Sequence, residues 1–317
     1  MNHLLAIRVF GRVVETGSFT RAADSLQMPK ATVTKLVQTL ETHLRVKLLL
    51  RTTRRVAVTA DGAAYYEQTS RLLNQLADVE TSLAGAQSRP RGRLRVDVGA
   101  SMARHVLIPA LQDFYARYPE MQIDLGVSDR PVDLIGDNVD CVIRAGTLQD
   151  DALVARSIAK LPWVTCATPG YLARRGMPQH PRDLAGGYCI VSYFSPRNGR
   201  RIPLRFQRNG ERIEIAPPSV LAVNDSNAHV TAGIAGVGLI QTFRFMVRPH
   251  IESGELVPVL DDWQPEPESV YLAYPFNRHL SMRLRVFADW VTDLFADRLG
   301  SGGAGTTTVA DRLARVD

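Results

Sequence analysis

Apolar positions recur at helical spacing through the first 44 residues and divide them into three segments. Residues 2 to 16 carry one apolar stripe, and Gly17 supplies a helix stop signal. Ser18 is a favourable cap for the segment that follows. Pro29 suits a helix start because no amide proton is needed there, so a third helix is predicted from about Pro29 to Leu44. The pattern predicts a helix-turn-helix.

The third predicted helix leaves short or polar side chains outward near its start, which suits insertion into a major groove. These residues are Lys30, Ala31, Thr32, Thr34, Lys35 and Gln38. Residues 47–51 and 56–58 then read as two short strands with cations between them, which predicts a β-wing that can follow phosphates or enter the minor groove. The remaining candidate DNA contacts are Ser18, Arg51, Thr53, Arg54 and Arg55. A surface hairpin with solvated arginines is the alternative.

A long helix is predicted from Thr59 to about Ala86, with apolar residues at alternating spacings of four and three. The seam of candidate dimer contacts consists of Tyr65, Leu72, Leu76, Val79 and Leu83. This narrow stripe predicts pairing with a second copy, and packing against the protein's own body is the competing explanation. Residues 88–93 contain Pro and Gly and mark a hinge.

The pattern changes at Arg93, where strands begin to alternate with helices. Strands are predicted at 94–98, 123–127, 140–144, 163–167, 189–193, 220–223, 238–240 and 270–274. Helices are predicted before Pro119, at 132–135, at 228–235 and at 280–295. This alternation predicts an α/β fold built from parallel βαβ units.

The charge is divided unevenly along the 317 residues. Residues 1–60 hold ten Lys or Arg and three Asp or Glu, a net charge of +7, while the whole chain carries +6. The remaining residues therefore sum to −1. A basic head on a near-neutral body is the electrostatic footprint of a DNA-binding module, although an unevenly charged solvated surface is the alternative.

Several classes of protein do not fit the sequence. The first ten residues do not have the pattern of a signal peptide, so none is expected. The longest uncharged stretch, 226–243, is too polar for a membrane span, so a cytoplasmic location is expected. Cys141, Cys166 and Cys189 are widely spaced, which favours buried structural thiols over a disulfide framework, a zinc site or redox sensors. The seven histidines occur singly and no catalytic motif is present, so neither an enzyme nor a cofactor is expected.

An ordered series of motifs in the first 62 residues resembles the LysR-type transcriptional regulators. The motifs are Ala22-Ala-Asp-Ser-Leu26, Ala31-Thr-Val-Thr34 with Leu40-Glu41, Leu48-Leu49 with Arg51-Thr-Thr-Arg-Arg55, and Thr59-Ala-Asp-Gly62. The resemblance implies a dimeric or tetrameric DNA-binding protein. The chain departs from the family's pattern at Pro29, Lys30 and Arg45, where the family usually has Ser, Gln and Gly. Lys donates to guanine or phosphate where Gln pairs best with adenine, so Lys30 predicts a contact that tolerates guanine better or depends more strongly on salt.

The same resemblance covers the second part of the chain more loosely. It rests on Ile108-Pro-Ala-Leu111, Pro169-Gly-Tyr-Leu172, Pro181-Arg-Asp-Leu184, Asn224-Asp-Ser226, Gly236-Val-Gly238 and Phe287-Ala-Asp-Trp290. It implies a two-lobed, periplasmic-binding-protein-like effector domain, with lobe one from about 93–163 and 268–298. The expected organisation is a winged helix-turn-helix at 1–60, a linker and dimerisation helix at 61–92, the effector domain at 93–298, and a disordered tail at 299–317.

Effector contacts are expected beyond the carboxyl ends of the strands, where helix starts offer amides to anions. The candidates are Ser101, Met102, Arg144, Gly146, Thr147, Ser192, Phe194, Asn224 and Ser226, and a small carboxylate is the expected ligand. Caps, an ion pair or core packing would explain several of these residues equally well.

The sequence therefore predicts an effector-responsive transcription factor whose partners are promoter DNA, a small anionic effector, further copies of itself and RNA polymerase, with no membrane. A small-molecule-binding protein without a transcriptional role is the alternative.

Overall fold

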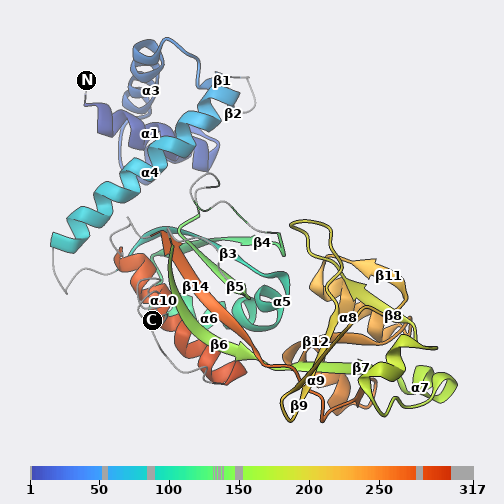
Figure 1. Ribbon diagram of the computed structural model, residues 1–317. Coiled ribbons are helices and arrows are strands. Elements are labelled where there is room, and N and C mark those ends of the chain that lie inside the picture. The colour runs from blue at the N-terminus through green and yellow to red at the C-terminus, as the bar shows by residue number, and fades with distance from the viewer. Residues whose placement is uncertain are drawn as a thin grey trace, which may run out of the picture. The chain divides into compact units, whose positions relative to one another are not determined.

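The computed structural model describes residues 2–51, 56–83, 90–130, 132, 134, 137, 139–146, 153–275 and 281–300. The chain forms two compact units, Met1–Ser88 and Arg89–Asp317 (Figure 1). None of the described helices combines the length and the apolar composition that crossing a membrane requires.

The first unit begins with three helices, α1 (His3–Thr16), α2 (Phe19–Leu26) and α3 (Lys30–Leu44). The Asn2 and Ser18 side chains each accept a hydrogen bond from the amide three residues on, which satisfies an otherwise unpaired helix amide. Gly17 ends α1 in the left-handed conformation, with φ 61°. The three predicted helices are confirmed, and α3 begins one residue later than predicted because Pro29 is its N-cap.

The helices bury one apolar core. Its fully buried members are Ala6, Val9, Phe10, Val13, Ala22, Val33 and Leu40, with Val37 nearly so. Burying one large apolar side chain contributes roughly 1.5–3 kcal/mol, and the small Ala22 leaves room for the neighbouring helices. Leu36 and Leu44, also predicted to face inward, are half-buried.

Arg45 ends α3 with φ 56°, in the left-handed region where a glycine is favoured. This is the position at which the sequence departs from the usual glycine. The arginine therefore holds a strained conformation in order to end the helix.

A short antiparallel hairpin follows, formed by β1 (Leu49–Arg51) and β2 (Val56–Val58), with Leu49 opposite Val58. The predicted cationic tip, 52–55, lies outside the described residues. Thr59 then joins the hairpin to α4 (Ala60–Leu83): its hydroxyl donates to the Lys47 carbonyl at 2.7 Å and accepts from the Gly62 amide at 2.9 Å. A Cβ on Gly62 would lie 2.1 Å from the Leu48 carbonyl oxygen, so only glycine fits here.

Glu41 ties the end of α3 to the first strand. Its side chain is 7% exposed, and one carboxylate oxygen accepts from the amides of Leu48 and Leu49 at 3.0 and 3.1 Å. The other oxygen accepts from the Lys47 ammonium at 3.0 Å. Burial raises the pKa of Glu41, but these donors together outweigh burial and hold the pKa below its ordinary value.

The second unit contains two lobes, and the first is built on a five-stranded sheet. The strand order is β4 (Met121–Val127), β3 (Gly92–Val98), β5 (Cys141–Ala145), β14 (Glu268–Pro275) and β6 (Leu153–Leu161). A continuous helix runs from Ala100 to Arg117 as α5 (Ala100–Met102), a π-helical turn (Ala103–Leu107) and α6 (Ile108–Arg117). With α10 (Met282–Leu299) it packs against the sheet (Figure 1), and Phe114 contacts Phe287 and Trp290 at ring distances of 5.8 and 4.9 Å.

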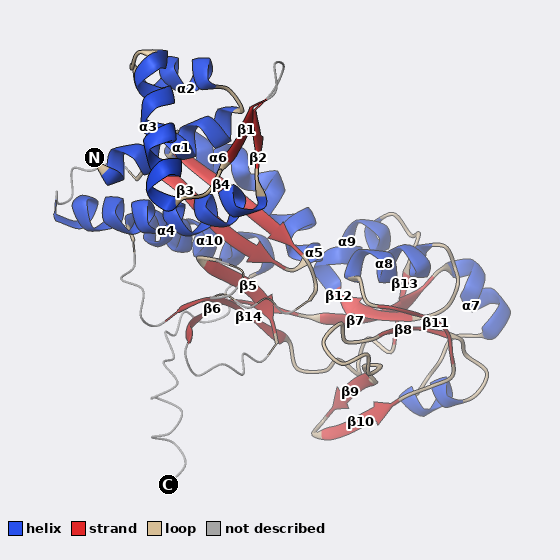
Figure 2. Cartoon of the chain, turned by 90° about the horizontal axis from the view of Figure 1, so that it is seen from above, coloured by secondary structure: helices blue, strands red, loops and turns tan. Residues whose placement is uncertain are grey.

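The second lobe lies between β6 and β14 in the sequence. Its central sheet has the order β12 (Ile240–Phe243), β7 (Trp163–Ala167) and β13 (Val257–Val259), and β8 (Ile190–Tyr193) pairs in parallel with β11 (Ser219–Val223). The helices are α7 (Pro169–Arg175), α8 (Ser226–Ile234) and α9 (Arg244–Glu252). A separate hairpin of β9 (Leu204–Arg208) and β10 (Glu211–Ile215) completes the lobe (Figure 2).

Three sequence predictions need correction. The sheets are mixed, not parallel throughout, because β14 runs antiparallel to both β5 and β6 after returning from the second lobe. The strand predicted at 238–240 begins at Ile240, because pairing with β7 starts there and Leu239 forms only an isolated bridge with Ile190. Two residues of the helix predicted at 132–135 lie outside the described part of the chain, and the other two are not helical.

Candidate functional site

The outer face of α3 is the candidate DNA-binding surface. Lys30, Ala31, Lys35 and Gln38 are exposed, while Thr32 and Thr34 are half-buried. Pro29 makes no side-chain cap, so the helix start presents amides and two lysines on one surface. Amides at a helix start and lysine ammonium groups both bind phosphate, so this face can contact duplex DNA.

Other predicted DNA contacts have different surroundings. Ser18 caps α2 through the Arg21 amide, so its hydroxyl already has a structural role. Arg51 lies in β1, but its side chain lies outside the described part of the structure, as do Thr53, Arg54 and Arg55.

The predicted dimer seam of α4 is only partly uncovered. Tyr65 packs on Phe10 within the same unit at a ring distance of 5.9 Å, which fits the competing explanation for that residue. Leu72 is 60% exposed and Leu76 is half-buried, so Leu72 is the one described seam residue that is fully open to a partner helix. The side chains of Val79 and Leu83 are not described.

The second unit has a cleft of about 580 Å³ lined from both lobes. The lining residues are Ala100, Ala103, Arg104, Ile108, Val127, Ser128, Asp129, Arg130, Asn224, Asp225 and Asn227. Two helices begin at this cleft, the long helix of lobe one at Ala100 and α8 of lobe two at Ser226. Arg104 lies in the π-helical turn, a feature that often marks functional positions in helices.

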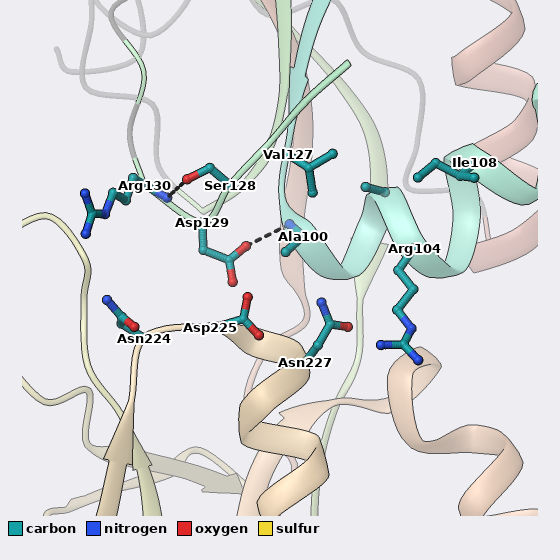
Figure 3. A pocket seen from close by; sticks show the side chains of 11 residues that line it. Ala100, Arg104, Ile108, Val127, Ser128, Asp129, Arg130, Asn224, Asp225 and Asn227 are labelled. Atoms are coloured by element: carbon teal, nitrogen blue, oxygen red, sulfur yellow. Dashed lines mark hydrogen bonds between the residues drawn. The ribbon is translucent and has the colours of Figure 1, made fainter. Parts of the chain in front are cut away.

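Asp129 lies at the centre of the cleft (Figure 3). Its carboxylate accepts from the Ala100 amide at 2.8 Å and from the Ser226 amide at 2.9 Å. The Tyr193 hydroxyl lies 3.4 Å from the same carboxylate and 3.3 Å from the Asn224 carbonyl oxygen. Burial and the nearby Asp129 charge raise the pKa of Tyr193, so its hydroxyl keeps the proton that it donates.

Arg144 lies behind the cleft and pairs with the buried Asp97 of the neighbouring strand. Its guanidinium also donates to the Arg130 carbonyl at 3.1 Å. Burial raises the pKa of Asp97 and outweighs the charge of Arg144, which acts in the opposite direction. Three buried polar atoms at or near the cleft, Arg144 Nη1, Ser226 Oγ and Asn227 Oδ1, have no hydrogen-bond partner among the described residues.

The structure brings only some of the predicted effector residues to the cleft. Asn224 lines it, Ser226 contributes its amide, and Arg144 lies behind it. Ser101 and Met102 are buried in the first turn of the helix, and Met102 belongs to the apolar core.

Four further predicted positions are not among the lining residues described. Ser192 is buried in β8, and Phe194 forms an isolated bridge with Arg201. The Gly146 amide donates to the Ser269 carbonyl at 3.0 Å, and Thr147 lies outside the described residues.

Sequence reasoning missed Arg104, Asp129, Arg130 and Asn227 as cleft residues, whereas Asp225 lies within the candidate stretch 224–226. A signal for two of them was present, because Asp129 and Arg130 follow the carboxyl end of the predicted strand 123–127. The same topological rule that selected the other candidates would have selected them.

Comparisons with known proteins agree with this architecture. Residues 4–63 match the family described as "Bacterial regulatory helix-turn-helix protein, lysR family", and residues 87–296 match "LysR substrate binding domain". The chain is 40% identical over 297 residues to an HTH-type transcriptional repressor of Pseudomonas aeruginosa, a match that covers 94% of this chain and 93% of that protein.

Two solved full-length structures have the same fold. The Vibrio cholerae virulence activator AphB has 27% identity and a TM-score of 0.58, over 92% of this chain and 98% of that chain. CrgA of Neisseria meningitidis has 32% identity and a TM-score of 0.58, over 91% and 97%. The chain therefore belongs to the LysR family of transcriptional regulators, with a DNA-binding helix-turn-helix followed by an effector-binding domain.

Proposed function

We propose that this regulator responds to a small carboxylate bound in the cleft between the lobes of its effector domain. One observation carries the proposal: amides at the starts of two helices, one from each lobe, converge on a single carboxylate position. Helix starts favour anions because their amides lack partners within the helix and the helix dipole is positive there. Arg104 and Arg130 add positive charge along the same cleft.

The proposal for DNA is that α3 enters a major groove with its exposed face. Lys30 and Lys35 would contact guanine edges or phosphates, and the wing arginines would follow the backbone. Lys30 in place of the family's usual glutamine supports a contact that tolerates guanine or depends more strongly on salt.

Assembly and output complete the proposal. Two copies would pair through α4 around the exposed Leu72. Closure of the lobes on an effector would then change the placement of the two DNA-binding heads on an inverted-repeat site. Domain bounds at 1–60, 61–92 and 93–298 are part of this proposal, as are a contact with RNA polymerase and a cytoplasmic location, where promoter DNA is found. The proposal includes no catalytic activity.

A thermal-shift panel tests the effector class. Purified full-length protein is heated with small carboxylates and with their neutral amides at equal concentration. A carboxylate present at about 100 times its Kd should stabilise the fold by about 2.7 kcal/mol, and its amide should not. Arg104→Met should weaken the response, whereas Arg298→Met, at the exposed end of α10, should leave it unchanged.

Two results would refute parts of the proposal. If carboxylates and amides stabilise the protein equally, the effector is not selected for negative charge. If a carboxylate binds but does not change the footprint on the protein's own upstream promoter, the cleft does not control DNA binding. The second result would favour a small-molecule-binding role without regulation.

A further inference from the structure

Asp129 comes from lobe one, but its carboxylate contacts the starts of helices in both lobes. It follows β4 in a turn that the Ser128 hydroxyl stabilises by accepting from the Arg130 amide at 3.0 Å. From there one carboxylate oxygen accepts from the Ala100 amide (Figure 3). The other oxygen accepts from the Ser226 amide. The second bond crosses the cleft, so this side chain links the lobes.

Two carboxylates serve the start of α8, each at a different amide. Asp225 already caps the helix, because its side chain accepts from the Ala228 amide at 2.7 Å. Figure 3 shows the Asp129 carboxylate pointing toward the helix start that Asp225 caps, so two like charges share one end of the cleft. Like charges repel each other, so the charge of Asp225 in the same cleft opposes the charge of Asp129.

The charge of the cleft depends on Asp129. The charged side chains that line it are Arg104, Arg130, Asp129 and Asp225, which balance one another. Moving Asp129 away leaves the lining with a net positive charge and leaves two helix-start amides open to another anion. The Tyr193 hydroxyl loses little in that movement, since the Asn224 carbonyl oxygen lies within reach of the same proton.

We propose that Asp129 is a tethered stand-in for the effector: it occupies the anion position of the cleft until the carboxylate of the effector displaces it. The inference rests on the proposed function that the cleft binds a small carboxylate. The incoming carboxylate takes over the amides of Ala100 and Ser226, while Ser226 Oγ and Arg144 Nη1, which lack partners among the described residues, supply further donors. Displacement breaks the link between the lobes, and this is the conformational signal.

Chemical rescue tests the proposal on the full-length protein. Asp129→Ala removes the carboxylate and leaves a place of the same shape, so sodium acetate should raise the Tm of this variant more than that of the wild type. Because acetate no longer competes with a tethered group, its Kd should fall by on the order of tenfold or more. Sodium chloride controls for ionic strength, acetamide controls for shape without charge, and Asp297→Ala removes an exposed carboxylate elsewhere.

Asp129→Asn keeps the test usable if the alanine variant does not fold, because asparagine retains the size of the side chain and one acceptor oxygen. Acetate should displace this neutral side chain more easily than the native carboxylate, giving a Kd between those of the other two proteins. If acetate stabilises the wild type and both Asp129 variants equally, the stand-in is refuted.

The outcomes also separate this inference from the proposed function. If metabolite carboxylates stabilise the wild type but Asp129→Ala gains no affinity for acetate, the role proposed for Asp129 is refuted, while the proposed carboxylate effector is supported. If Asp129→Ala gains acetate binding but no carboxylate in the panel acts on the wild type, Asp129 holds an anion position and the proposed effector class is wrong.

Discussion

Glu41→Gln tests how the end of the recognition helix is joined to the wing. Glutamine keeps the shape and one acceptor oxygen but loses the charge. Hydrogen bonds to charged groups contribute about 1.5–3 kcal/mol and neutral ones about 0.5–1.5 kcal/mol, so the two bonds from Leu48 and Leu49 should weaken by roughly 2 kcal/mol in total. The Lys47 ammonium adds little because its side chain is 74% exposed.

Hydrogen exchange of the Leu48 and Leu49 amides in the full-length protein measures this loss locally. A loss of about 2 kcal/mol corresponds to exchange about 30-fold faster. Glu41→Ala leaves both buried amides without an acceptor and should lower the free energy that protects them by roughly 4 kcal/mol. Glu80→Gln, at an exposed position of α4, is the matched control and should change exchange very little.

The same residue predicts a pH dependence. The folded pKa of Glu41 lies below the unfolded value, so its contribution is fully present above the unfolded pKa and is lost as pH falls through the folded pKa. The protection of the Leu48 and Leu49 amides against hydrogen exchange should therefore decrease in acid in the wild type. The decrease should be smaller in Glu41→Gln. Unchanged protection in both Glu41 variants at neutral pH would refute the role assigned to this carboxylate.

Four further substitutions have defined outcomes. Lys30→Gln should lower the salt slope of operator binding by about 0.9 for each phosphate that the lysine no longer neutralises, or change base preference; an unchanged slope and preference would make Lys30 an idle surface charge. Arg45→Gly should raise the free energy of unfolding by about 1 kcal/mol, because glycine adopts the left-handed conformation without strain, and a lower Tm would contradict this. Gly62→Ala should lower the free energy of unfolding, measured by chemical denaturation, by about 2 kcal/mol, because its methyl group would clash with the Leu48 carbonyl. Gly186→Ala, where the added atom meets nothing within 4 Å, should lower it far less. Asp97→Asn should lower the free energy of unfolding by about 3 kcal/mol, because Arg144 is left buried without its partner charge. An unchanged Tm would show that solvent reaches the pair.

Local signals were sufficient to predict most of the first unit. Gly17, Ser18 and Pro29 act at helix ends through their own backbone chemistry, which does not depend on distant residues. The β9–β10 hairpin was missed although its turn, Asn209-Gly210, is the strongest short hairpin signal, and both residues have positive φ in the structure.

Other features depend on contacts between distant segments. The antiparallel direction of β14 is fixed by its return from lobe two, which no local pattern of residues 268–275 records. The Asp129 bond to Ser226 joins residues 97 positions apart, and capping by Asp225 alone would have explained that helix start from sequence. The strand-end rule led to Asn224 and Ser226, but it was not applied after the strand 123–127, so Asp129 was missed. The contacts between lobes were not predicted.

Binding of the protein to its own upstream promoter fragment tests the regulator assignment most directly. A salt titration of the full-length protein should show affinity that falls steeply with salt, together with tighter binding than to a scrambled duplex of the same length and composition. Equal affinity for both duplexes at every salt concentration would contradict sequence-specific reading by α3.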